Sequence, residues 1–349
     1  MSGIIDLHCD TILECCGEKE GLRNYIGHIS LEKMKKGGAM AQCFAAFVTQ
    51  KVENWLGDRT GDKDSYELFL RMSDFLAKQV AANSDLILPA YSAADIREND
   101  RNGKMSAVLT VEDCVLLDGK IERVDVMAER GVCMASLLWN YENSVGFPNN
   151  KDAQKHMLGL KPFGIEAVER MNEKGIIVDV SHLSEGGFYD VLKYSKKPFA
   201  ASHSCARALC DHSRNLTDEQ LRKLGEAGGV VGVNFYSAFL TEGSNMSANE
   251  RIVEHMVYMA DKAGIEALAL GSDFDGIDCE LEMKDYSGYP TLLDALAKHF
   301  TAAQMDKIMS ENFLRVMEDC DCGRSAVRSS CAERDASENY VNPTLKPAY

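Results

Sequence analysis

The chain has 349 residues and a formal net charge of −16 at pH 7, and 45% of its residues are hydrophobic. This composition is typical of a globular protein, and the acidic balance disfavours nucleic acid and anionic membranes as partners. The sequence shows neither an apolar stretch of transmembrane length nor a signal-peptide pattern, and its twelve cysteines fit no disulfide framework. We therefore expect a cytoplasmic protein with reduced thiols.

Eight short apolar runs recur along the chain, and helix-like stretches follow several of them. Each run is nearly continuous in apolar or small residues, which is typical of strands covered on both faces. Amphipathic helical patterns occupy 65–83, 217–229 and 249–264 between or after these runs. The runs themselves occupy 3–10, 41–48, 105–113, 132–140, 175–182, 198–204, 229–236 and 267–275.

Eight strand–helix units without a linker predict an α/β protein with a closed (β/α)8 TIM-like barrel. We expect a single catalytic barrel over 1–320, ending in a helix at 301–319, and an extended or disordered C-terminal tail over 321–349. The alternative is an open doubly wound sheet, which favours a glycine-rich phosphate loop after an early strand. The sequence contains neither GxGxxG nor a P-loop.

Polar residues stand at the ends of the predicted strands. The first run, "GIIDLHCD", ends in His8 and Asp10, which point to the same side of a strand because they are two residues apart. The carboxyl ends of barrel strands face a common mouth, so the polar residues that end later strands are expected to join them. These later residues are Glu112, His182, His203, Asp273 and Asp275.

This set of imidazoles and carboxylates, without thiolate, favours Zn²⁺, with Mn²⁺, Co²⁺ or Fe²⁺ as alternatives. Two metals about 3.5–4 Å apart and bridged by a carboxylate would use all these ligands. The other histidines lie in loops or helical patterns and are expected at the surface or in caps: His28, His212, His255 and His299. His156 lies in a long polar loop after the fourth run, either in solvent or folded back over the mouth.

The order and spacing of six motifs resemble the renal (membrane) dipeptidase family of zinc peptidases, in a bacterial-type member. The motifs are "DLHCDT", "TVEDC", "DVSH", "ASHS", "SRNLTDEQL" and "GSDFDG", and the resemblance covers residues 3 to about 318. It implies a (β/α)8 barrel of the metal-dependent hydrolase type. It also implies hydrolysis of dipeptides, often with a D-residue tolerated at the C-terminal position.

The resemblance assigns roles to individual residues. Arg214 would bind the C-terminal carboxylate of the substrate together with Tyr236, and Asp273 would transfer the proton. One zinc would take the first strand's pair and Glu112, and the other would share Glu112 and take the two later histidines. The implied metal ligands are His8, Asp10, Glu112, His182 and His203.

The fourth strand departs from the family. The mammalian members end it in Leu-Thr-His, whose histidine steadies the oxyanion, whereas this chain reads "SLLWNYEN". Trp139 stands at the matching position and Asn140 follows it, so both are expected in the substrate pocket. Asn140 or His156 is then a candidate for the missing donor.

We expect metal-assisted hydrolysis, in which water between two Zn²⁺ ions becomes hydroxide and attacks the peptide carbonyl of a dipeptide. One alternative is another binuclear amidohydrolase, acting on a β-lactam, a lactone or an N-acyl amino acid. A second is a catalytically weak metal-binding barrel, suggested by the change at Trp139. A homodimer is also expected.

Overall fold

A closed barrel of eight parallel strands forms the centre of the computed structural model, which describes residues 3–16, 21–50 and 64–320. The ring closes because β2 pairs with β1 on one side and with β4 on the other, while β1 pairs with β10. The predicted barrel is confirmed and the open sheet is wrong. The strands are β1 (Ile4–Asp6), β2 (Ala39–Phe47), β4 (Met105–Glu112), β5 (Met134–Ser136), β6 (Ile177–Asp179), β7 (Ala200–Ser204), β8 (Val230–Val233) and β10 (Leu268–Leu270).

Each of the eight predicted runs overlaps one barrel strand, but the sequence reading missed three short strands. The strand β3 (Ile87–Pro89) pairs with the first residues of β4, with Ile87 opposite Met105. It is too short to show a period, and its proline cannot donate to a ladder. The other two, β9 (Met246–Ser247) and β11 (Glu280–Leu281), pair with each other outside the barrel.

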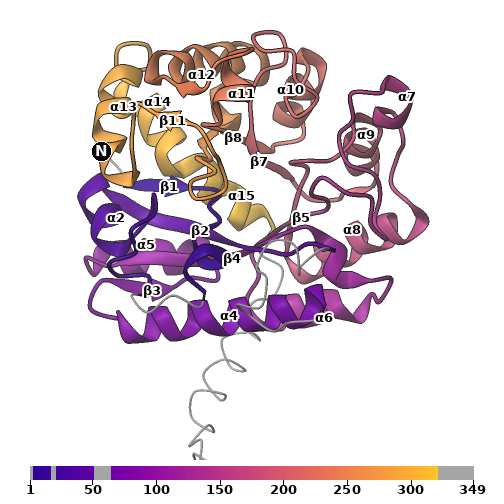
Figure 1. Ribbon diagram of the computed structural model, residues 1–349, viewed down its shortest axis with the longest axis horizontal. Coiled ribbons are helices and arrows are strands. Elements are labelled where there is room, and N and C mark those ends of the chain that lie inside the picture. The colour runs from indigo at the N-terminus through magenta and orange to yellow at the C-terminus, as the bar shows by residue number, and fades with distance from the viewer. Residues whose placement is uncertain (1–2, 17–20, 51–63, 321–349) are drawn as a thin grey trace, which may run out of the picture.

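Helices surround the barrel (Figure 1). Local signals fix several of their ends: the Asp64 carboxylate accepts from two backbone N–H groups at the start of α4, and Thr217 and Gln220 form a capping box on α10. The helices are α1 (Thr11–Cys15), α2 (Leu31–Gly37), α4 (Ser65–Ala82), α5 (Ala93–Arg101), α6 (Glu122–Glu129), α7 (Ala153–His156), α8 (Pro162–Lys174), α9 (Glu185–Tyr194), α10 (Asp218–Glu226), α11 (Ser237–Leu240), α12 (Asn249–Ala263), α13 (Tyr289–Leu296), α14 (Ala302–Asp306) and α15 (Asn312–Cys320).

The last helix, α15, packs against residues from the strands. Phe313 and Met317 belong to one buried cluster with Val108 of β4 and Val230 of β8. Val108 shares its strand face with Glu112, which lies four residues further along. The helix therefore packs against the strand face that carries Glu112, at a point nearer to the start of β4 than Glu112 lies. The polar residues that follow the strands lie at the opposite end of the barrel from this helix. A π-helical turn at Lys307–Glu311 interrupts the helix predicted at 301–319, and the predicted tail lies outside the described residues.

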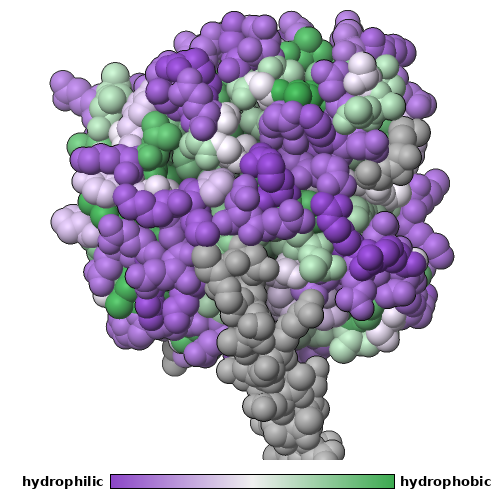
Figure 2. Space-filling view, turned by 180° about the vertical axis from the view of Figure 1, so that it is seen from behind, coloured by the Kyte–Doolittle hydropathy of each residue, from purple (hydrophilic) through white to green (hydrophobic). Residues whose placement is uncertain are grey.

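The surface seen from behind is mostly hydrophilic, with hydrophobic residues scattered between polar ones (Figure 2). Among the described residues, no helix combines the length and apolarity needed to cross a membrane.

Candidate metal centre

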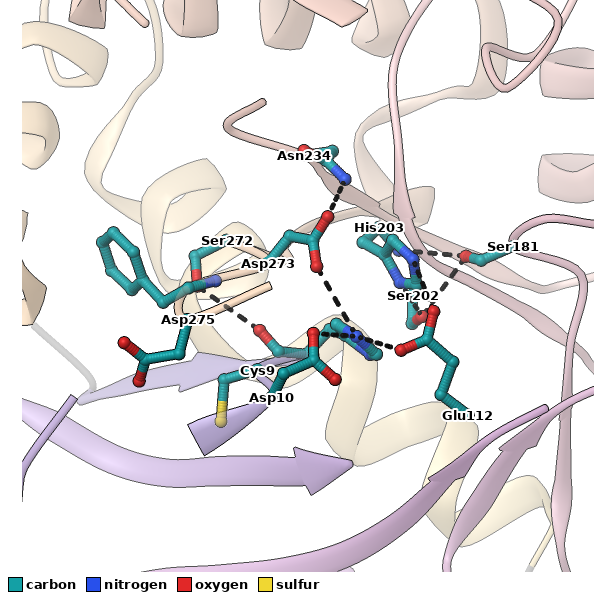
Figure 3. Close-up of polar contacts among 12 residues, drawn as sticks. Cys9, Asp10, Glu112, Ser181, Ser202, His203, Asn234, Ser272, Asp273 and Asp275 are labelled. Atoms are coloured by element: carbon teal, nitrogen blue, oxygen red, sulfur yellow. Dashed lines mark hydrogen bonds and ion pairs between the residues drawn. The ribbon is translucent and has the colours of Figure 1, made fainter. Parts of the chain in front are cut away.

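Side chains from the ends of several strands meet at one mouth of the barrel (Figure 3). His8 Nε2 lies 3.6 Å from Asp10 Oδ2 and 3.3 Å from Glu112 Oε2. The same nitrogen lies 3.7 Å from Asp273 Oδ1. Ligand atoms of His8, Asp10 and Asp273 lie within 4.8 Å of one another, as do those of His8, Glu112 and His203. The strand ends thus bring these side chains to one point.

The other carboxylate oxygen of Glu112 faces two histidines. Glu112 Oε1 lies 2.9 Å from His182 Nε2 and 3.8 Å from His203 Nε2. The two Nε2 atoms lie 3.1 Å apart, and the His8 ring stacks on the His203 ring at a centroid distance of 3.9 Å. One carboxylate oxygen of Glu112 therefore lies beside His8, and the other lies beside the histidine pair.

The residues present fit divalent cations. His8 Nε2 and Asp10 Oδ1 are buried without a hydrogen-bond partner within the described part of the chain, which is costly unless something else binds them. A Cβ on Gly276 would lie 2.0 Å from Asp10 Oδ2, so any larger residue at this position would displace the Asp10 carboxylate. Imidazole nitrogens and carboxylate oxygens together are ligands that zinc accepts.

The backbone is strained where the site residues leave their strands. His182 and Asp273 have φ angles of 67° and 64°, in the left-handed region that residues other than glycine rarely adopt. Such conformations persist where the surrounding structure imposes them, and they cluster at functional sites. They support a functional role for this mouth of the barrel.

Burial shapes the charges of the site. It lowers the pKa of His182 and of His203 well below the usual value, and the positive charges of Arg214 and His8 lower it further. Both rings are therefore neutral, which is the form that binds a metal ion. Burial and the nearby Asp10 raise the pKa of Glu112 to about 8, because this carboxylate is crowded among other carboxylates. Bound cations would relieve that crowding.

Arg214 lies directly behind the histidine pair. Its Nη2 donates to the His203 carbonyl oxygen at 3.2 Å, and its Nη1 lies 3.4 Å from Ser204 Oγ. Its Nε is buried without a hydrogen-bond partner among the described residues. The guanidinium carbon lies 5.3 Å from the centre of the Phe239 ring, and Tyr236 packs edge-on against the same ring at 5.0 Å. Arg214 and Tyr236 thus pack against the same aromatic ring.

The segment that follows β5 places an aromatic side chain, Trp139, beside His182. The Trp139 ring lies 4.9 Å from Phe47 and 6.4 Å from His182, measured between centroids. Asn140 is exposed, and its Oδ1 lies 3.1 Å from His182 Nδ1. Both residues therefore lie next to one of the predicted metal ligands.

Two other predicted polar residues, Asp275 and His156, have clear positions. Asp275 accepts from Thr11 Oγ1 at 2.6 Å and from the His28 backbone N–H, so it lies outside both groups of candidate ligands. His156 is buried, and it lines a small cavity with His182 and Arg214.

The surface position predicted for His255 is wrong. Its side chain is fully buried, with ring nitrogens bonded to the Ala206 N–H and the Leu240 carbonyl. Its spacing from Ile252 and Met259, three and four residues away on α12, is the signal that identifies this buried face.

The sequence reading also missed the residues that support the site. Asn234 Nδ2 donates to Asp273 Oδ2 at 2.8 Å, and Ser202 Oγ lies 2.7 Å from His203 Nδ1. Asp179 accepts from Ser202 Oγ at 2.5 Å. A carboxylate inside the apolar run "GIIVDVSH" was the available signal for Asp179, because an unpaired charge there is costly.

The barrel and the buried cluster at its mouth define a metal-dependent hydrolase of the (β/α)8 type. The family model of membrane dipeptidases (peptidase family M19) matches residues 1–330. The chain therefore belongs to the membrane dipeptidase family, and it is a hydrolase of the metallo-dipeptidase kind.

Similar proteins agree with this family. A dipeptidase of Claviceps purpurea is 29% identical over 302 residues, covering 86% of this chain and 71% of that protein. An uncharacterized dipeptidase of Schizosaccharomyces pombe is 31% identical over 307 residues, covering 83% of this chain and 71% of that protein. A metallopeptidase of Rhodobacter sphaeroides, solved with a phosphinate mimic of L-Ala-D-Ala, is 25% identical with a TM-score of 0.82, covering 92% and 99% of the two chains.

Proposed function

We propose that this chain hydrolyses the peptide bond of dipeptides at a centre of two zinc ions bridged by Glu112. The observation that carries the proposal is the position of Glu112, with Oε2 3.3 Å from His8 and Oε1 2.9 Å from His182. One zinc would be held by Glu112 with His8 and Asp10, and the other by Glu112 with His182 and His203. Mn²⁺, Co²⁺ or Fe²⁺ would accept the same ligands.

The metals supply one part of the chemistry: when bound, they lower the pKa of water and polarise the scissile carbonyl. The protein supplies the proton transfer. Asn234 holds Asp273 through Oδ2, so Oδ1 is left facing His8 and the mouth of the barrel. From this position Asp273 takes the proton of the attacking water and passes it to the leaving amine.

Arg214 sets the length of the substrate. A planar guanidinium bonds both oxygens of a carboxylate, and this one is only 5% exposed, so its ligand leaves water on binding. Because it lies beside His203, it favours a free carboxylate one residue beyond the scissile bond. Tyr236 lies close enough, across the Phe239 ring, to contribute to the same pocket.

The acceptance of a D-residue at the C-terminal position is part of the proposal. It is supported by the L-Ala-D-Ala mimic in the Rhodobacter sphaeroides structure, since that protein shares the fold over most of its length. Trp139 and Asn140 would form the wall beside His182, in place of the histidine found in the mammalian members.

A panel of substrates tests the proposal against its alternatives. The zinc-loaded protein is offered L-Ala-L-Ala, L-Ala-D-Ala, N-acetyl-alanine, a β-lactam and a lactone at equal concentration. We expect the two dipeptides to have the highest kcat/KM. Preferred turnover of any other compound would favour a different binuclear amidohydrolase, and two bound metals without turnover would favour a catalytically weak barrel.

Location, assembly and domain limits complete the proposal. Ten cysteines within the described residues are free thiols, most of them buried, which supports a reducing compartment such as the cytoplasm. The homodimer and the division into a barrel over 1–320 and a tail over 321–349 stay predictions. Light scattering on the full chain and on a chain ending at residue 320 tests both.

A further inference from the structure

Two histidines of the site have an oxygen atom beside the ring nitrogen that faces away from Glu112. Ser202 Oγ lies 2.7 Å from His203 Nδ1, and Asn140 Oδ1 lies 3.1 Å from His182 Nδ1. A neutral imidazole carries one proton, so the partner of one nitrogen decides whether the other presents a lone pair. These oxygens therefore help to determine whether each Nε2 atom has a free lone pair with which to bind a metal ion.

For His203 the proton positions follow from Asp179. This carboxylate can only accept, and Ser202 Oγ lies 2.5 Å from its Oδ2, so the single hydroxyl proton of Ser202 points to Asp179. The Ser202 oxygen then accepts from His203 Nδ1–H. His203 consequently presents its Nε2 lone pair towards Glu112 and His182.

For His182 the corresponding acceptor is a neutral amide oxygen. Asn140 Oδ1 has no proton to give, so His182 Nδ1 carries the proton and Nε2 is left with its lone pair. The two Nε2 atoms, 3.1 Å apart, are then both acceptors, and no proton joins them. Two nitrogen lone pairs that face each other in this way are suited to bind one cation between them.

We infer that Asn140 is a positioning residue, whose side-chain oxygen holds His182 in the Nδ1–H form and aims its Nε2 at the metal position beside Glu112. This inference rests on the proposed function, in which His182 is a metal ligand. Oxygen acceptors behind metal-binding histidines typically change metal affinity 10- to 100-fold when they are removed. The side chain is exposed, so replacing it places little of the fold at risk.

A matched pair of variants separates the oxygen from the size of the side chain. Asn140→Leu keeps the size and removes the acceptor, while Asn140→Asp keeps an oxygen in the same place. Zinc affinity is measured by competition with a chromophoric chelator on the full-length protein, and the tautomer of His182 by NMR of ¹⁵N-histidine-labelled protein. We expect one zinc to bind 10- to 100-fold more weakly in Asn140→Leu, nearly normal binding in Asn140→Asp, and an Nδ1–H tautomer for His182 in the parent protein.

The outcomes separate this inference from the proposed function. If His182→Ala loses one zinc while Asn140→Leu keeps both at the parent affinity, the inference is wrong and the ligand assignment stands. Equal weakening in Asn140→Asp and Asn140→Leu also overturns it, because the oxygen would then have no role. If His182→Ala binds both zinc ions normally, the ligand assignment itself is wrong.

Discussion

Arg214 donates from Nη2 to the backbone carbonyl oxygen of His203 at 3.2 Å, so a buried cation is fixed directly behind a predicted metal ligand. Burial lowers the pKa of Arg214, and the carboxylates of Asp273 and Glu112 oppose that shift. An arginine keeps its charge in proteins. The structure therefore holds a buried positive charge beside His203.

We predict that Arg214→Ala removes the preference for a free C-terminal carboxylate. In the parent protein Ala-Ala should be cleaved and Ala-Ala amide should not, because only the acid pairs with the guanidinium. Removing one partner of a buried charge pair costs about 2–5 kcal/mol in transition-state binding, measured as kcat/KM. Arg214→Lys is the control: it keeps the charge without the planar fork, and we expect partial activity. Equal rates of the parent protein on the acid and the amide would contradict the assignment.

Trp139, which follows β5, is the subject of a second prediction. The Trp139 ring lies 4.9 Å from Phe47 and 6.4 Å from His182, at the position where the resemblance to the family predicts a histidine. One oxyanion donor is typically worth about 10²–10³ in kcat. We expect Trp139→His to raise kcat on Ala-Ala and Trp139→Phe, which keeps the aromatic packing, to leave it unchanged or lower. A matching gain in both variants would point to steric relief instead of a donor.

The contribution of His156 to that missing donor is tested separately. His156 lies in the cavity shared with Arg214, but its ring nitrogens lie 3.1 Å from the Asn150 backbone nitrogen and from Arg207 Nη2. We therefore expect His156→Ala to leave kcat largely unchanged. A large loss of kcat at unchanged zinc affinity would make His156 the donor.

The sequence predicted the features that depend on a local pattern of residues, and it missed those that depend on contacts between different strands. The barrel strands could be predicted because each run is nearly continuous in apolar or small residues. The candidate ligands could be predicted because they interrupt that pattern at a strand end. The contact of Asp179 with Ser202 links β6 to β7, and no local pattern specifies which side chains meet across two strands. β3 lies beside β4 for a few residues only, so it left no periodic signal.

His255 yields a prediction for the pH dependence of stability. Burial, helped by the charge of Arg251, lowers the pKa of His255 to about 4, while an unfolded histidine titrates near 6.5. Between these values the unfolded chain binds a proton that the folded chain does not, so the free energy of unfolding falls as the pH drops. The full effect is about 2–3 kcal/mol between pH 7 and pH 4.

The variant His255→Asn isolates this effect, because an asparagine oxygen and NH₂ group can replace the two ring nitrogens without titrating. Chemical denaturation of both proteins at several pH values gives the difference in the free energy of unfolding, from which shared contributions such as metal loss cancel. We expect the advantage of the parent protein to shrink towards pH 4. A constant difference across that range would show that His255 does not titrate there.

The two-metal centre bridged by Glu112 is the central claim, and the metal content of Glu112→Gln tests it most directly. Elemental analysis of the zinc-equilibrated parent protein should give two metals per chain. Because the amide lacks the charge that both ions share, Glu112→Gln should lose affinity for both together, and Asp10→Asn should mainly affect one. Two metals retained at normal affinity in Glu112→Gln would contradict the bridge.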